Sequence, residues 1–115
     1  MLSRRLACSL AAVLLLPAAL SAQTTFATIT GTVTDSTGAV IGSATVTATS
    51  VETNIVTTAQ ANEVGIYTLA QLKEGTYTVK ARATGFKEYV AQNVVLISRD
   101  LRRLDIQLDV GSVET

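Results

Sequence analysis

The segment from Gly65 to Phe86 constrains the fold most, because it alternates apolar and polar residues on both sides of a glycine. After Gly75, Tyr77 and three smaller apolar residues alternate with threonine, lysine and arginine. A period of two is typical of a half-buried strand. Tyr67 keeps the same rhythm before the glycine. The segment therefore predicts a β-hairpin whose two tyrosines point into one core.

The same alternation recurs along the chain, and turn residues separate the segments. Asp35-Ser36-Thr37-Gly38 and Asn62-Glu63-Val64-Gly65 have the composition of turns. Further strands are predicted over Phe26–Thr34, Ser43–Val51, Ile55–Ala61, Glu88–Ile97 and Leu101–Val110. The pattern does not show which residues of Ile55–Ala61 point inward. The predicted inward residues are Ile29, Gly31, Val33, Ala44, Val46, Ala48, Leu104, Ile106, Leu108 and Val110.

Seven short strands at a spacing of roughly 8–12 residues predict an all-β fold, a β-sandwich. A short helix over Leu101–Leu108 is the weaker alternative, since Ile106 and Val110 extend the period of two. The abundant threonine and valine also favour a pleated sheet over a helix.

The first 22 residues have the three parts of a secretory signal peptide. Two arginines lie in Met1–Arg5, Leu6–Leu16 is almost wholly apolar, and small residues end at Ala22. The apolar run is shorter than the roughly 20 residues that span a bilayer, so a membrane anchor is the weaker alternative. We expect cleavage after Ala22, with Ser21 as the alternative, and export to the periplasm or the outer membrane, or secretion.

Removal of residues 1–22 would take away two arginines and the single cysteine, Cys8. The remaining chain is mildly negative, so it lacks the basic surface that binds nucleic acid. It suits one small domain without disulfides, whose stability comes from sheet packing. The expected organisation is a lead-in over residues 23–28, a sandwich over 29–110 and a tail over 111–115.

The spaced glycines and tyrosines resemble the carboxypeptidase regulatory-like domain. The matching segments are Ile29–Asp35, Gly38–Val46, Gly65-x-Tyr67, Gly75-x-Tyr77, Gly85-Phe86 and Leu104–Leu108. The resemblance implies a seven-stranded, prealbumin-like β-sandwich with Greek-key connections. The sequence departs from the family in two places: Ile41-Gly42-Ser43 lacks the usual proline, and Lys73-Glu74 replaces the usual Pro-Pro before Gly75. The residues predicted to be structural are Gly31, Gly38, Gly65, Tyr67, Gly75, Tyr77, Gly85 and Phe86.

Residues for catalysis are scarce. The chain has no histidine, and after cleavage it would have no cysteine, which removes the commonest general base, the thiolate and the usual zinc ligands. The carboxylates are scattered at turns and outward positions. Asp35–Gly38 lacks the further ligands of a calcium loop and is better interpreted as a turn. We therefore expect no catalytic residue, no metal site and no cofactor.

Other residues could bind a partner. Tyr67, Tyr77 and Tyr89 could stack on sugar rings, although Tyr67 and Tyr77 are better interpreted as core. Outward threonine rows, such as Thr28 to Thr32 and Thr45 to Thr49, could form an adhesive array but are better interpreted as a soluble exterior. Any binding is expected at the turns Asp35–Gly38 or Asn62–Gly65, because loops carry function on a rigid sandwich.

A signal peptide followed directly by such a domain is similar to the start of bacterial TonB-dependent outer-membrane receptors, in which a plug and barrel would follow. We therefore expect a non-catalytic envelope domain, either an extension or fragment of such a receptor, whose contact with the outer membrane would require a barrel absent from this chain. The alternative is a free secreted or periplasmic module that binds a glycan or an envelope protein. An enzyme is disfavoured.

Overall fold

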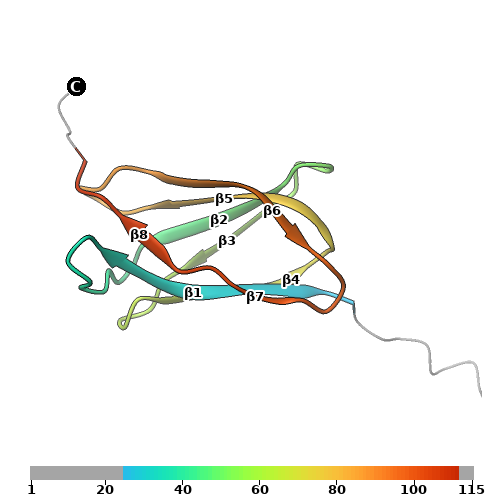
Figure 1. Ribbon diagram of the computed structural model, residues 1–115, viewed down its shortest axis with the longest axis horizontal. Coiled ribbons are helices and arrows are strands. Elements are labelled where there is room, and N and C mark those ends of the chain that lie inside the picture. The colour runs from blue at the N-terminus through green and yellow to red at the C-terminus, as the bar shows by residue number, and fades with distance from the viewer. Residues whose placement is uncertain (1–24, 112–115) are drawn as a thin grey trace, which may run out of the picture.

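The computed structural model describes residues 25–111, which form two facing β-sheets without a helix (Figure 1). The first sheet has β1 (Ala27–Asp35) at its centre, β4 (Ile66–Leu72) antiparallel on one side, and β7 (Leu101–Arg103) and β8 (Ile106–Leu108) parallel on the other. The second has the order β3 (Val56–Gln60), β2 (Thr45–Ser50), β5 (Gly75–Arg82) and β6 (Tyr89–Leu96), all antiparallel. The predicted all-β sandwich is confirmed.

The core lies between the sheets and consists of the inward residues of alternating strands. In β1, β2 and β5 the buried positions have the period of two that the sequence predicts. The largest fully buried side chains are Ile29, Val33, Val46, Tyr67, Leu69, Leu72, Val79, Leu96, Ile106 and Leu108. Because burial of each such side chain contributes about 1.5–3 kcal/mol, this layer is the main source of stability.

The prediction of seven strands is wrong, because the closing segment Leu101–Val110 is broken in two. β7 ends at Arg103 and β8 begins at Ile106, which gives eight strands in the described residues. Val110, predicted to point inward, is 70% exposed and forms only an isolated bridge with Phe86.

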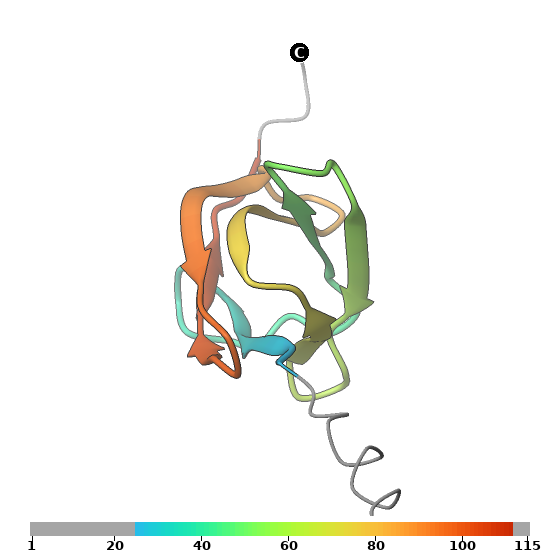
Figure 2. The same ribbon diagram turned by 90° about the vertical axis from the view of Figure 1, so that its right-hand side faces the viewer.

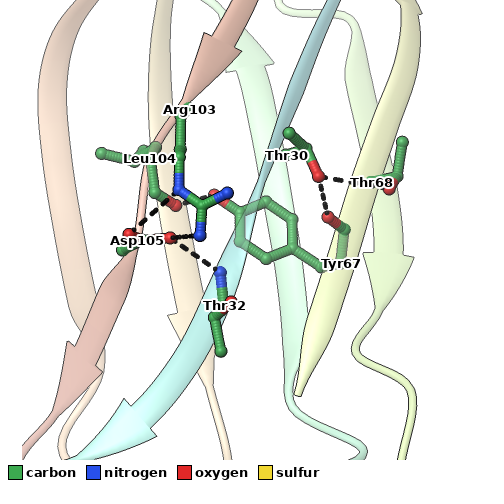
Figure 3. A network of polar contacts seen from close by, with 7 residues as sticks. All are labelled: Thr30, Thr32, Tyr67, Thr68, Arg103, Leu104 and Asp105. Atoms are coloured by element: carbon green, nitrogen blue, oxygen red, sulfur yellow. Dashed lines mark hydrogen bonds and ion pairs between the residues drawn. The ribbon is translucent and has the colours of Figure 1, made fainter. Parts of the chain in front are cut away.

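The break has a local cause, shown in Figure 3. The Leu104 N–H donates to the Thr30 carbonyl (2.8 Å), but the Leu104 carbonyl turns inward and accepts a hydrogen bond from the Tyr67 hydroxyl. The Thr32 N–H instead donates to Oδ1 of Asp105 (3.0 Å). The Asp105 side chain thus supplies the acceptor that the Leu104 carbonyl would otherwise provide in the β-ladder.

Gly31 makes this arrangement sterically allowed. A Cβ atom at Gly31 would lie 2.0 Å from the Leu104 carbonyl oxygen and 3.1 Å from a ring carbon of Tyr67. Only a residue without a side chain permits so close an approach. Gly31 is therefore required by contact with a distant strand and not by its own backbone conformation.

Different strand ends and turns lie at the two ends of the sandwich. One end holds the start of β1, the β2–β3 turn, the β4–β5 connection and the end of β6, whereas β8 lies toward the other end (Figure 1). The predicted signal peptide (1–22) and its cleavage site lie outside the described residues. Within residues 25–111, no helix could cross a membrane.

Candidate functional site

A cavity of about 660 Å³ opens at the end of the sandwich where β1 begins. Four segments far apart in the sequence line it, and Figure 2 views this end of the molecule, with the yellow β4–β5 connection lying between the sheets. The lining residues include Phe26, Ser50, Glu52, Thr53, Ile55, Thr57, Gln71, Leu72, Lys73, Glu74, Gly75, Tyr77, Leu96 and Ile97.

The cavity is predominantly apolar. Leu72, Leu96 and Tyr77 line it from the core and are at most 5% exposed. Phe26 and Ile97 line it from the surface and are 44% and 65% exposed. Large apolar side chains that gather around one concave site, with a few polar groups among them, are typical of binding pockets.

The β2–β3 turn brings Ile55 to the cavity. Ser50 organises this turn, since its carbonyl accepts from the Asn54 N–H (2.8 Å) and its hydroxyl oxygen accepts from the Thr53 N–H (3.2 Å). Asn54 takes a positive φ of 61°, which asparagine tolerates better than most residues. The chain thereby reverses, and Ile55 is left 59% exposed beside the cavity.

The β4–β5 connection forms the facing wall. The Tyr77 hydroxyl donates to the Lys73 carbonyl (2.7 Å), and Gly75 has a φ of 145°. Oε1 of Glu52 accepts from the Thr76 N–H (3.3 Å) and would lie 3.0 Å from a Cβ at Gly75. The Glu52 carboxylate thus joins the two turns, and a side chain at Gly75 would push it away.

The two acidic groups at the cavity have structural partners. Glu74 accepts a hydrogen bond from the Ser98 hydroxyl (2.6 Å), which connects the β4–β5 connection to the β6–β7 turn. Burial raises the pKa of Tyr77, and the Glu52 charge raises it further. Tyr77 therefore remains a protonated donor at neutral pH.

This cavity can bind a ligand by burying its apolar surface, but it offers few reactive groups. Within residues 25–111 no three histidine, cysteine or acidic side chains are close enough to hold a metal ion. Every buried side-chain nitrogen or oxygen of the described residues has a hydrogen-bond partner. The cavity therefore favours an apolar group, with Glu52, Lys73 and Glu74 available to polar atoms at its edge.

The structure places the predicted tyrosines in the core. Tyr67 is 1% exposed and Tyr77 is 5% exposed, so neither offers an open face to a sugar ring. Tyr89 is half-buried and packs against the core. Of the predicted structural residues, only Gly75 and Tyr77 line the cavity.

Gly38, Gly65 and Gly85 take positive φ angles of 92°, 81° and 88°, and Phe86 is partly buried against the core. These residues belong to turns away from the cavity, as do the predicted binding loops Asp35–Gly38 and Asn62–Gly65, none of which lines it.

Asp35–Gly38 is a hydrogen-bonded turn. Oδ1 of Asp35 accepts from the Thr37 hydroxyl (2.7 Å), the Thr37 N–H (2.8 Å) and the Ala39 N–H (3.1 Å). These bonds, led by the Thr37 hydroxyl, hold the pKa of Asp35 below its ordinary value. The carboxylate stabilises the turn, which agrees with the interpretation of this segment as a turn.

Sequence reasoning missed the cavity. Phe26, Ile55 and Ile97 are end residues of predicted strands, but in the structure each lies one residue outside its strand. The alternating pattern therefore does not place their side chains. The sequence feature that could have indicated the cavity is that large apolar residues lie directly beside turns. These residues become neighbours only because the four segments meet at one end of the sandwich.

Fold and cavity together define a class of protein, an all-β sandwich with an apolar cavity at one end. The family model of the carboxypeptidase regulatory-like domain matches residues 28–109. The chain therefore belongs to the carboxypeptidase regulatory-like domain family. No curated protein matches it in sequence.

Solved structures show where the same fold occurs. A candidate carbohydrate-binding protein from Bacteroides uniformis is 23% identical with a TM-score of 0.58, covering 71% of this chain and 40% of that one. A chain of a type II cohesin–X-dockerin complex from Acetivibrio cellulolyticus is 24% identical (TM-score 0.56; 74% and 58% covered). Catechol 1,2-dioxygenase from Acinetobacter radioresistens is 11% identical (TM-score 0.62; 79% and 54% covered). At these identities the similarity establishes the fold alone, and this chain spans 40% to 58% of those chains.

Proposed function

We propose that this chain is a non-catalytic domain of the bacterial cell envelope, exported by its N-terminal leader and acting as the N-terminal extension of a TonB-dependent outer-membrane receptor. A leader-like segment followed directly by a domain of this family supports the envelope location. The prealbumin-like Greek-key connectivity implied by the resemblance is part of this proposal.

The observation that carries the non-catalytic role is the use made of the polar groups at the cavity. Glu52 and Glu74 accept hydrogen bonds from neighbouring turns, and Tyr77 donates to a carbonyl. Catalysis requires a base, a nucleophile and an orienting group within reach of one reacting atom. These side chains hold loops together instead, and the cavity between them is apolar.

Export and receptor context are tested separately. The gene is expressed in a bacterial host, the cells are fractionated, and the N-terminus is read by mass spectrometry, with Gln23 expected as the first residue. Retention of residues 1–22 in the cytoplasm would contradict export. Genomic sequence downstream of Thr115 tests the context, because an adjoining plug-and-barrel frame is expected and a clean terminator would contradict it.

A second candidate function is a free secreted or periplasmic module that binds a glycan or a protein through the cavity. Its support is the exposure of Phe26, Ile55 and Ile97 around one opening. The test is an NMR titration with oligosaccharides and with apolar peptides, read at residues near the cavity. Ile97→Ser should weaken a genuine site, whereas Val90→Ser, a similarly exposed change outside the cavity, should not.

Hydrolase assays complete the test of the non-catalytic role. Peptide and glycoside substrates are offered with and without zinc and calcium, and no turnover is expected. Turnover that survives repurification and is lost on a single change of Glu52 or Glu74 to the matching amide would contradict the proposal.

A further inference from the structure

Three of the four sheet edges have features that hinder pairing with another chain. β4 and β6 each contain a bulge, where the register shifts and Gln71 or Asn93 takes a φ of 61°. The edge formed by β7 and β8 is interrupted at Leu104 and includes two arginines in β7. Bulges, charges and breaks are the usual protection of exposed strand edges.

β3 is the edge without such a feature. Its register with β2 is uninterrupted from Thr45 opposite Gln60 to Thr49 opposite Val56. The strand, Val-Thr-Thr-Ala-Gln, has no charged residue and no proline, and its residues have no positive φ. Because the other edges are protected, this difference marks β3 as a surface for strand pairing.

The free hydrogen-bonding groups of β3 belong to Val56, Thr58 and Gln60. The Ser50 N–H donates to the Ile55 carbonyl (2.9 Å), and the Ala61 N–H donates to the Ala44 carbonyl (2.8 Å). Alternate residues of an antiparallel strand bond to the same neighbour. Ile55 and Ala61 both bond to the β2 side, so every second residue between them bonds to β2 as well. The N–H and C=O groups of the remaining residues point away from β2. Among the described strands, β3 pairs with β2 alone.

We propose that β3 pairs antiparallel with β3 of a second copy of this chain, with Thr58 opposite its counterpart. In this register Val56 lies opposite Gln60 of the second copy, so every outward residue of β3 is bonded, with two main-chain hydrogen bonds per pair. The interface has two-fold symmetry, and it joins the two β3-β2-β5-β6 sheets into one continuous sheet.

The occupant is a second copy because the edge is self-complementary. The central pair of threonines is a favourable cross-strand pair. β3 carries no charged residue, so the pairing sets no like charges opposite one another. The inference goes beyond the proposed function and does not depend on the cavity.

The test is sedimentation of the exported, processed protein at concentrations from about 10 μM to about 1 mM, the upper value being the weak end of specific association. We expect a dimer whose fraction rises with concentration. Thr58→Lys sets two ammonium groups opposite one another and should weaken dimerisation by up to about fivefold. Thr68→Lys, the same change at an exposed position of the β4 edge, is the matched control and should leave dimerisation unchanged.

Crosslinking locates the contact. In the processed protein, which has lost Cys8 with its leader, Thr58→Cys should give a disulfide-linked dimer on mild oxidation, because paired Cα atoms about 5.5 Å apart suit a disulfide. Thr68→Cys should give no disulfide-linked dimer. Melting temperatures close to that of the parent protein will show that these variants fold.

A protein that sediments as a monomer at about 1 mM overturns the proposal and leaves an extended segment of another protein as the occupant of this edge. A dimer that Thr68→Lys weakens and Thr58→Lys does not would overturn it equally, since the contact would then involve β4.

Discussion

The Tyr67 hydroxyl donates a hydrogen bond to the main-chain carbonyl of Leu104, and this contact connects β4 to the segment between β7 and β8 across β1 (Figure 3). The carbonyl would otherwise continue the parallel ladder with β1. Because it turns inward, Asp105 replaces it as acceptor for the Thr32 N–H. A tyrosine, a glycine and an aspartate thus form one unit that closes the first sheet.

Tyr67→Phe should lower the free energy of unfolding by about 1–3 kcal/mol. The substitution keeps the ring but leaves the Leu104 carbonyl without its donor, and an unpaired buried acceptor costs about this much. Urea denaturation followed by circular dichroism measures the loss. Tyr89→Phe is the control, since the Tyr89 hydroxyl has no hydrogen bond within residues 25–111. Equal effects of the two changes would contradict the role of the Tyr67 contact.

Tyr67 also predicts a loss of stability at alkaline pH. Burial raises the pKa of Tyr67 far above the ordinary value of 10.0, with smaller increases from Tyr89 and Asp105. The unfolded chain releases this proton near pH 10 while the folded chain retains it, so stability falls as the pH rises above that value. Unfolding free energies at about pH 9 and about pH 11 should differ more in the parent protein than in Tyr67→Phe.

Gly31→Ala should be severely destabilising, by about 3 kcal/mol or more, because its Cβ would lie 2.0 Å from the Leu104 carbonyl oxygen and neither main chain can move without breaking the ladder. Gly38→Ala is the matched control. A Cβ at Gly38 meets nothing within 4 Å, so only the strain of its positive φ remains, about 1–2 kcal/mol. A Gly31→Ala protein that melts like the parent would show that the carbonyl is placed elsewhere.

Asp105 should contribute a small stability that is lost in acid. The bond from the Thr32 N–H, followed by the Arg103 side chain, holds the pKa of Asp105 below its ordinary value of 3.8. The contribution is therefore complete above about pH 4 and disappears as the pH falls through the lower folded pKa. Asp105→Asn should cost less than about 1 kcal/mol at neutral pH, since the group is exposed. The free energy of unfolding is measured by denaturation at pH 7 and below pH 3, with Asp109→Asn as the control. Asp105→Asn should reduce the difference between the two pH values, whereas Asp109→Asn should leave it unchanged.

Tyr77→Ala should cost about 3–5 kcal/mol, as large truncations in cores do. Tyr77 is 5% exposed, and its removal would also open the inner wall of the cavity. Thr78→Val, on the outer face of the same strand, should change the denaturation midpoint little. A midpoint unchanged by Tyr77→Ala would show that its ring is not part of the core.

The inward faces of most strands could be predicted from the sequence because their pattern depends only on neighbours along the chain. Ile29, Val46 and Val79 are buried as predicted. The break at Leu104 could not be predicted in this way, since its cause is a hydroxyl on another strand. The bulges at Gln71 and Asn93 likewise have no local glycine or proline to announce them.

The phase of β3 illustrates a second limit. Its residues alternate between exposed and half-buried positions, and none of them is fully buried. Threonine occurs on both faces, so the composition does not distinguish them. The cavity was missed for a similar reason, because Phe26, Ile55 and Ile97 become neighbours only through the meeting of distant turns.

The path of the chain through the sandwich has a mechanical consequence. β1 begins at one end, β8 leads to Val110 at the other, and the two strands are parallel and hydrogen-bonded from Val33 opposite Ile106 to Asp35 opposite Leu108. Tension applied between Ala27 and Val110 would therefore pull these strands past one another along their length. The bonds between them would share the load and break together, so the domain would resist stretching as a clamp, and single-molecule pulling would register one high-force event rather than a gradual unzipping.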